Sequence, residues 1–226
     1  MKAVILAAGL GTRMQPLTNE IPKPLLTIGG IPLIERIIRA FPPEISEVVI
    51  VIGYLGDQIK NFLGSEFLGK KIDYVFQGNP ASGTMEALKL CRSYLDGEKR
   101  FFVFYSDDLI DGETLKKMMA YDLAAAVAAH PEPQKFGVVI VDENEDIKEI
   151  VEKPEHPLSN IVLANGLLLS NDIFAYEPTV ENGREKYLSY ALSLMVKDRK
   201  MKAVMADQWI PIGTPEDLTK ANQFLS

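Results

Sequence analysis

Two cations, Arg13 and Lys23, stand in a stretch of chain whose backbone is restricted by glycine and proline. The stretch reads LAAGLGTRMQPLTNEIPKPL over residues 6–25 and directly follows a short apolar run. Glycine after a first strand lets backbone N–H groups come close to a phosphate, because it has no side chain and adopts many backbone angles. Cations on a restricted backbone suit a polyphosphate whose charge shifts during a reaction. The stretch therefore predicts a site for phosphate chemistry.

The spacing of the glycines excludes two familiar phosphate-binding loops. A dinucleotide-binding loop has the pattern G-x-G-x-x-G, but Met14 stands where the third glycine would follow Gly9 and Gly11. A nucleoside-triphosphatase loop ends in Gly-Lys followed by Ser or Thr, and no such sequence follows these glycines. What remains is a glycine turn that carries Arg13 and a proline-rich stretch that carries Lys23.

Composition limits the classes of function. With 226 residues, of which 47% are hydrophobic, the chain can bury a full core, and we expect one α/β domain over residues 1–226. The net charge of −7 argues against a nucleic-acid surface, which would be basic. Residues 1–40 nevertheless hold five Lys or Arg against two Asp or Glu, a local balance of +3. A basic segment in an acidic protein favours an anionic small molecule as the ligand.

Cysteine and apolar runs indicate the compartment. The only cysteine, Cys91, excludes an internal disulfide and a cysteine cluster for zinc, so we expect a cytoplasmic protein in which Cys91 serves packing. No apolar run reaches the ~20 residues that a membrane helix needs, and we expect no signal peptide and no membrane partner. The sequence leaves the number of subunits open.

The order of expected elements predicts a Rossmann-like α/β fold, with a mixed, mostly parallel sheet flanked by helices. Short β-branched runs alternate with segments of helical period through the first half, as in β-α-β units, and the second half is richer in strands. Such sheets bind ligands at the carboxyl ends of their strands, where the glycine turn, Gln77 and Asp107 fall. The expected strands are 2–8, 47–54, 71–77, 101–106, 122–130, 136–143, 147–154, 160–170 and 201–206, and the expected helices are 32–41, 57–64, 83–95, 184–198 and one after 215.

Seven segments, in order, resemble the signature segments of the sugar-1-phosphate nucleotidylyltransferases. That family joins a nucleoside triphosphate to a sugar 1-phosphate and releases pyrophosphate. The resemblance implies a short, catalytic-domain-only member of glycosyltransferase-A-like architecture, with a nucleotide-binding half (1–120) and a sugar-phosphate-binding half (121–226). The segments are LAAGLGTRMQPLT with PKPL, GTMEAL (83–88), YSDD (105–108), FGVV (136–139), EKP (152–154), ANG (164–166) and WIPIGTPEDL (209–218).

The resemblance assigns roles on the nucleotide side. It implies that Arg13 grips the departing phosphates and that Lys23 contacts the α-phosphate. Gln77 would meet the base, because an amide offers the donor and the acceptor that a pyrimidine imide requires, so UTP or dTTP is favoured. Cytidine and guanosine triphosphates stay open as alternatives, as does a Gln77 that merely lies on an exposed turn. The implied nucleotide-binding residues are Leu6, Ala7, Ala8, Gly9, Gly11, Thr12, Gln77, Gly83 and Thr84.

A polyphosphate also calls for a divalent cation, and Mg²⁺ prefers one or two carboxylates together with phosphate oxygens and water. Asp107 ends the apolar run FFVFYS and is the expected ligand, the alternative being a helix cap. Many relatives have a second aspartate where this chain has Pro211. Water or another carboxylate such as Asp207 could fill that place, or metal binding is weakened.

The sugar phosphate is expected in the second half of the chain. Gly137 permits a close backbone approach, and the Glu152 carboxylate can accept protons from sugar hydroxyls. Lys153 can pair with the phosphate, and Asn165 can bridge hydroxyls. The resemblance implies each of these roles, and His130 is given none.

Two other functions stay open. A cytidylyltransferase acting on phosphocholine or a similar compound shares the first motif, but it would need an aromatic cage for the quaternary ammonium. Residues 152–166 contain no Phe, Tyr or Trp, which disfavours it. A nucleotide-binding regulatory protein without turnover is the other alternative, motivated by Pro211.

Overall fold

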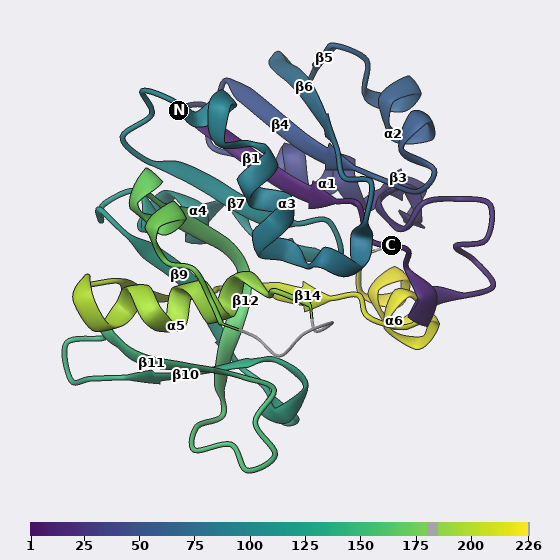
Figure 1. The fold of residues 1–226 in the computed structure, drawn as a ribbon. Helices are drawn as coiled ribbons and strands as arrows, with labels where there is room; N and C mark the ends of the chain where they lie inside the picture. The colour runs from purple at the N-terminus through teal and green to yellow at the C-terminus, as the bar shows by residue number, and fades with distance from the viewer. Residues whose placement is uncertain (180–184, 226) are drawn as a thin grey trace.

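Strand β1 (Lys2–Ala7) lies in the middle of a ten-stranded sheet (Figure 1). It pairs in parallel with β4 (Glu47–Ile52) on one side and with β7 (Phe101–Tyr105) on the other. β4 in turn pairs in parallel with β6 (Lys70–Phe76). All four strands run in one direction, so their carboxyl ends meet at one edge of the sheet. The parallel β-α-β arrangement predicted for the first half is confirmed.

The second half adds antiparallel strands to the same sheet. The long strand β12 (Ile161–Leu169) runs antiparallel to β7, to β9 (Ala124–Ala129) and to β10 (Gly137–Val141). β10 forms an antiparallel ladder with β11 (Ile147–Glu152), and β13 (Lys202–Met205) pairs in parallel with β9. The sheet is therefore mixed, as predicted, and continuous across the expected boundary between the halves.

Helices cover both faces of this sheet (Figure 1). α3 (Thr84–Leu90) and α5 (Leu188–Asp198) bury their apolar residues in the hydrophobic cluster on one face. α1 (Leu33–Arg39) and α4 (Gly112–Met118) do so on the opposite face. In each helix the buried side chains recur three or four residues apart, because that spacing places them on one side of a helix.

The computed structural model describes residues 1–179 and 185–225. Within this part of the chain no helix is both long and apolar enough to cross a bilayer. The remaining elements are β2 (Thr27–Ile28), β3 (Ile31–Pro32), α2 (Gly56–Leu63), β5 (Glu66–Phe67), β8 (Asp108–Ile110), β14 (Trp209–Pro211), α6 (Pro215–Leu225) and six 3₁₀ helices (Thr12–Met14, Lys23–Leu25, Pro80–Ser82, Arg92–Leu95, Pro133–Lys135, Asn171–Ala175).

Cys91 follows α3 and is fully buried in the hydrophobic cluster beneath it. Burial raises the pKa of its thiol to about 12. The thiolate is the reactive form of cysteine, so this environment suits a packing residue rather than a nucleophile.

Candidate active site

The glycine turn after β1 is held by Gly11. Its φ of 65° lies in the left-handed region, which glycine adopts without steric cost. The Gly11 carbonyl accepts hydrogen bonds from the Thr18 hydroxyl and from the Met14 N–H, each 2.8 Å long. A Cβ at position 11 would lie 3.0 Å from the Thr18 methyl group. The turn therefore needs a glycine here both for its backbone angle and for its packing.

A cleft of about 440 Å³ opens at the carboxyl ends of the parallel strands. Arg13, Lys23, Asp107 and every predicted nucleotide-binding residue except Ala7 line it. Ala7 is only 2% exposed and packs in the hydrophobic core, because successive side chains of a strand point to opposite faces. The cleft gathers residues of β1, the glycine turn, the 77–87 region and the end of β7, as the predicted topology requires.

Gln77 lines this cleft, which we call the nucleotide cleft because the predicted nucleotide-binding residues line it. Gln77 has 6% of its surface exposed. Its amide nitrogen donates to the Ser82 hydroxyl (2.9 Å) and to the Gly83 carbonyl (3.3 Å). Ser82 in turn donates to the Asn79 carbonyl, so its oxygen serves as an acceptor for Gln77. Because Gly83 offers only a carbonyl here, this network fixes which end of the amide carries the nitrogen. Gln77 is not an exposed turn residue.

Gly83 and Thr84 join the nucleotide half to the segment that precedes α5. Gly83 has φ 94°, and a Cβ there would lie 2.5 Å from the Lys186 nitrogen. The Leu188 N–H donates to the Thr84 hydroxyl (2.8 Å), and the Met85 N–H donates to the Lys186 carbonyl (2.9 Å). Position 83 must therefore be glycine for the two segments to pack, whatever it contributes to nucleotide binding.

Lys23 and Asp107 form an ion pair in the wall of the nucleotide cleft. Lys23 Nζ lies 2.8 Å from Asp107 Oδ2. Only 9% of the Lys23 side chain is exposed, against 34% for Asp107. The 3₁₀ helix Lys23–Leu25, entered from Pro22, holds the lysine in place. Lys23 is thus a buried cation rather than a surface charge, and it is held against the carboxylate that is expected from the sequence to be the metal ligand.

The next residue, Asp108, begins a small ladder in which β8 runs antiparallel to β14, with Asp108 directly opposite Pro211. The Trp209 indole N–H donates to Asp108 Oδ2 over 3.1 Å. Burial and the negative charge of Asp107 raise the pKa of Asp108 above its usual range, and the Lys23 ammonium acts in the opposite direction. Two consecutive acidic side chains therefore follow β7, close enough for the charge of Asp107 to act on Asp108.

Asn165, expected to bridge sugar hydroxyls, has a different environment. It is fully buried in β12. It lines neither the nucleotide cleft nor the second cleft, which is described below. Its Oδ1 accepts from the Tyr105 N–H (2.8 Å), and its Nδ2 donates to the carbonyls of Tyr105 (2.9 Å) and Asp108 (2.5 Å). The amide thus binds the backbone on both sides of Asp107, so we assign it a positioning role in place of the expected contact with sugar.

Replacing Asn165 by alanine is expected to lower the free energy of unfolding by about 3 kcal/mol or more. Three buried backbone groups, the Tyr105 N–H and the carbonyls of Tyr105 and Asp108, would lose a partner at about 1 to 3 kcal/mol each. Urea denaturation followed by circular dichroism measures this. Asn160→Ala, at an exposed position, is the matched control and should change stability by less than about 0.5 kcal/mol. Equal stability of the two variants would contradict the structural role.

A second cleft, of about 570 Å³, lies beside the first and contains Gly137, Glu152 and Lys153. We call it the sugar-side cleft, because these residues are predicted to bind the sugar phosphate. Gly137 pairs with Glu152 across the β10–β11 ladder, and a Cβ at Gly137 would lie 3.2 Å from Glu152 Oε2. Lys153 Nζ lies 3.5 Å from Glu152 Oε1 and 4.7 Å from the centre of the Tyr187 ring. Glycine thus leaves room for the carboxylate, and Lys153 is held between an anion and an aromatic face.

Sequence reasoning missed the aromatic residues of this sugar-side cleft. Phe136 and Tyr187 line it, and so does His130, which packs edge-on against Phe136 with ring centres 4.6 Å apart. Trp209 packs against Phe136 at 5.3 Å. The absence of aromatic residues from 152–166 therefore does not describe the cleft, because these rings come from other parts of the chain.

The two clefts meet at a shared set of residues that includes Arg13, Thr84, Tyr105, Asp107 and Gly213. A group bound in one cleft can therefore touch a group bound in the other beside Arg13 and Asp107. This is the geometry that a transfer between two bound substrates needs, because the reacting atoms must be brought within about 3 to 3.5 Å.

Asp207, considered as a substitute for the carboxylate missing at Pro211, lies outside both clefts. Its side chain is 52% exposed and forms an ion pair with Lys117 at 2.7 Å. Pro211 does line the sugar-side cleft, with a side chain that has no ligand atom. Asp207 therefore does not fill the gap at position 211.

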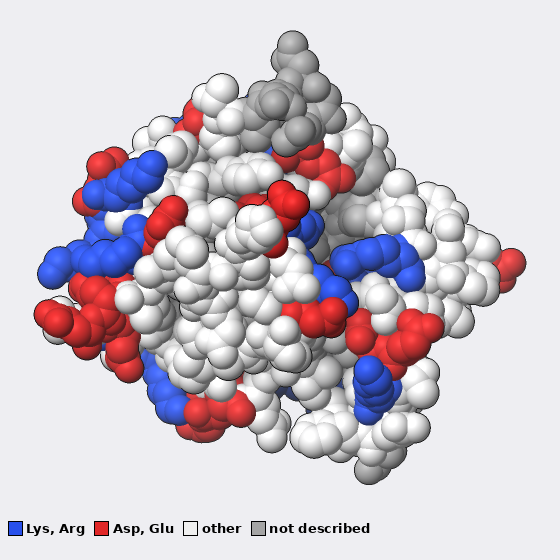
Figure 2. Space-filling view, turned by 90° about the horizontal axis from the view of Figure 1, so that it is seen from below, with Lys and Arg blue, Asp and Glu red and all other residues white. Residues whose placement is uncertain are grey.

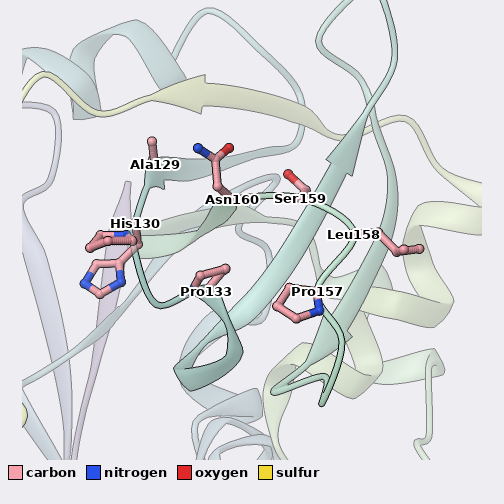
Figure 3. Close-up of a pocket in the computed structure, with 8 residues that line it drawn as sticks. Ala129, His130, Pro133, Pro157, Leu158, Ser159 and Asn160 are labelled. Carbon is pink, nitrogen blue, oxygen red and sulfur yellow. The ribbon is translucent and has the colours of Figure 1, made fainter.

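The described part of the surface has further hollows outside the two clefts. On the face drawn in Figure 2, basic side chains lie next to acidic ones around a hollow in the surface. Figure 3 shows a separate hollow between the end of β9 and the 157–160 loop, lined by His130, Pro133, Pro157 and Ser159 among others. His130 Nδ1 there accepts a hydrogen bond from the Glu132 N–H (3.0 Å). The other residues that line the hollow of Figure 3 carry no charged side chain, and we assign this hollow no ligand.

Comparison with known proteins shows which family this chain resembles. A family model described as nucleotidyl transferase matches residues 2–226. The chain is 31% identical to the bifunctional protein GlmU of Methanocaldococcus jannaschii, with all of this chain and 54% of that protein covered. It therefore spans about half the length of the GlmU proteins that it matches. It is 30% identical to the UTP–glucose-1-phosphate uridylyltransferase AglF of Haloferax volcanii, covering all of this chain and 96% of AglF.

Solved structures agree with the fold. A protein described as a glucose-1-phosphate thymidylyltransferase from Bacillus anthracis, in complex with sucrose, superposes with a TM-score of 0.85 at 25% identity, covering 99% of this chain and 94% of that one. A UDP-glucose pyrophosphorylase in complex with UDP-glucose gives a TM-score of 0.87 at 24% identity, covering 99% and 97%. The predicted fold class is confirmed.

Proposed function

Because this chain belongs to the nucleotidyl transferase family, we propose that it transfers a nucleoside monophosphate from a nucleoside triphosphate to a sugar 1-phosphate. The observation that carries the proposal is the meeting of two clefts at Arg13 and Asp107, with Lys23 paired to Asp107. One cleft contains the glycine turn and would take the triphosphate. The other contains Glu152 and Lys153 and would take the sugar phosphate.

In the proposed reaction a phosphate oxygen of the sugar 1-phosphate attacks the α-phosphorus of the triphosphate. A new phosphorus–oxygen bond forms, and the bond to the β-phosphate oxygen breaks and releases pyrophosphate. Lys23 neutralises the charge that grows on the α-phosphoryl oxygens, and Arg13 neutralises the departing pyrophosphate. Glu152 and Lys153 orient the attacking sugar phosphate, so the chain supplies positioning and charge rather than a covalent intermediate.

We propose Mg²⁺ as the cofactor, with Asp107 as a ligand. The donor set fits, because Mg²⁺ prefers carboxylate oxygen and Asp107 lines both clefts at the point where the phosphates would meet. When bound, the ion would neutralise charge on the triphosphate oxygens.

The cytoplasmic location stays a prediction.

For the base we propose uracil or thymine. Both hydrogens of the Gln77 amide nitrogen are engaged with Ser82 and Gly83, so the amide can offer the base only an acceptor, its carbonyl oxygen. The expectation that the amide offers the base a donor as well is corrected. Uracil and thymine carry an N3–H donor at the centre of this edge of the base, whereas cytosine has an acceptor at N3 and its donor is the neighbouring 4-amino group, at a different position. The relative AglF is named for UTP, and the thymidylyltransferase is named for a thymidine nucleotide.

Replacing Gln77 by alanine is expected to reduce the preference for UTP over CTP by about tenfold, because it removes the acceptor that distinguishes the two bases. The ratio of kcat/KM for the two triphosphates measures the preference. Gln134→Ala, at an exposed position outside both clefts, is the matched control and should leave the ratio unchanged. A wild-type protein that prefers CTP would contradict the proposed orientation of the amide.

The proposed function is tested by a matrix of triphosphates (UTP, dTTP, CTP, GTP) against sugar 1-phosphates, beginning with glucose 1-phosphate, with Mg²⁺ and pyrophosphate release as the readout. We expect release with UTP or dTTP and at least one sugar. Activity with phosphocholine alone would establish the cytidylyltransferase instead, although Lys153 already lies over the face of Tyr187 and would repel a quaternary ammonium. Nucleotide binding without release in any pair would establish the regulatory alternative.

A further inference from the structure

The end of β7 carries two consecutive carboxylates, and the proposed reaction uses only one of them. Asp107 and Asp108 both line the sugar-side cleft. Asp107 also reaches the nucleotide cleft, and its Oδ2 is paired with Lys23. The placement of Asp108 therefore needs an explanation of its own.

The β8–β14 ladder directs the Asp108 side chain. Asp108 stands directly opposite Pro211, and residues opposite each other in an antiparallel pair point to the same face with Cβ atoms about 4.5 to 5.5 Å apart. Pro211 lines the same cleft as Asp108 but has no donor atom. A carboxylate at position 108 can therefore reach the space that a carboxylate at position 211 would serve.

Three contacts hold Asp108 in a defined orientation. Trp209 Nε1 donates to its Oδ2, and Asn165 Nδ2 donates to its backbone carbonyl. The backbone N–H of Ile212 also hydrogen-bonds to this carboxylate. A carboxylate that is already oriented binds an ion at lower entropic cost, because little side-chain freedom is left to lose.

We infer that Asp108 is the second carboxylate for the divalent ion of the proposed reaction, and that it takes the place of a carboxylate at position 211. The inference rests on the proposed function for the presence of the ion, and it concerns which residues hold it. One carboxylate stands on β8 and the other directly before it. Together Asp107 and Asp108 supply the one or two carboxylates that Mg²⁺ prefers.

The test measures metal binding directly. Mn²⁺ serves as the probe, with free Mn²⁺ measured by electron paramagnetic resonance in the presence of UTP. Trp209 is the only tryptophan, so its fluorescence reports on the ion beside Asp108 in the same titration. The proteins compared are the wild type, Asp108→Asn, the double variant Asp108→Asn/Pro211→Asp and Asp207→Asn. Asparagine keeps an oxygen for the Trp209 N–H, so the first substitution removes charge and leaves the hydrogen bond.

We expect Asp108→Asn to weaken Mn²⁺ binding by about tenfold or more, a size that metal-site substitutions commonly show. The double variant should regain most of the loss, because it returns a carboxylate to the same face of the ladder. Asp207→Asn changes a surface carboxylate and should bind Mn²⁺ like the wild type. Rescue by Pro211→Asp separates a ligand from a merely structural Asp108, since a structural loss would not be repaired from position 211.

Mn²⁺ binding by Asp108→Asn that matches the wild type would overturn the inference, and so would a loss that the double variant fails to restore. A wild type that binds no Mn²⁺ with UTP would overturn it as well. The proposed function fails separately, if the wild type releases no pyrophosphate with any pair of substrates. A protein that turns over and binds Mn²⁺ independently of Asp108 would keep the function and reject this role.

Discussion

Replacing Lys23 by alanine is expected to lower kcat by about a hundredfold or more, the size found when one fixed electrostatic stabiliser of a transition state is lost. Lys23 is a nearly buried cation in the wall of the nucleotide cleft, held by a 3₁₀ helix and paired with Asp107 at 2.8 Å. Its charge would act on oxygens that become more negative as the reaction proceeds. The KM for the triphosphate should rise less than kcat falls, because such a contact strengthens in the transition state. Steady-state kinetics of pyrophosphate release measures both.

Two further variants separate charge from geometry at this position. Lys23→Arg keeps the charge but must fit a larger group into a side-chain site that is 9% exposed, so we expect only partial activity. Lys197→Ala, on the exposed side of α5, is the matched control for loss of a lysine and should leave kcat unchanged. A kcat of Lys23→Ala equal to that of the wild type would remove Lys23 from the proposed mechanism.

The core of the fold could be predicted because its determinants are local. The runs that became β1, β4, β6 and β7 are β-branched or aromatic and about the length of a strand, and helical-period segments separate them. Strands that alternate with helices in this way indicate a parallel sheet with crossover helices. The glycine turn could also be predicted from the sequence, because glycines and charged residues that are adjacent in sequence stay adjacent in space.

The β8–β14 ladder could not be predicted. Its two strands have three residues each and come from distant parts of the chain, so neither contains enough residues for an alternation to be recognised. The pairing of Asp108 with Pro211 is a consequence of this ladder. Without it, Asp207 was one of the alternatives for the gap at position 211, together with water, whereas Asp207 lies on the surface beside Lys117.

Residue type alone also could not predict the role of Asn165 or the aromatic residues that line the sugar-side cleft. An asparagine can bind a sugar hydroxyl or a backbone group equally well, and only its complete burial against Tyr105 and Asp108 decides between the two. Phe136 and Tyr187 stand far from one another in sequence and from the EKP segment, so their common cleft is a property of the folded chain.

The second large effect is expected at Asp107. Replacing it by alanine should lower Mg²⁺-dependent turnover by about a thousandfold, because metal-ion charge stabilisation contributes several kcal/mol and each 1.36 kcal/mol is a factor of ten. Asp107→Asn keeps the shape and removes the charge, so it should show most of the same loss. Asp207→Asn is the control for loss of a carboxylate outside the clefts and should retain activity. Activity is measured over a series of Mg²⁺ concentrations.

The Mg²⁺ titration also separates the two members of the ion pair. If Asp107 holds the ion, Asp107→Asn should require a higher Mg²⁺ concentration for half-maximal activity. Lys23→Ala should lower the plateau while the half-maximal concentration stays equal or falls, because Lys23 no longer competes with the ion for Asp107 Oδ2. A variant at Asp107 that keeps the wild-type Mg²⁺ dependence would exclude it as the ligand. A rise in the half-maximal Mg²⁺ concentration at both positions would mean that the pair acts only as a structural contact, because loss of a competing cation cannot raise the Mg²⁺ requirement.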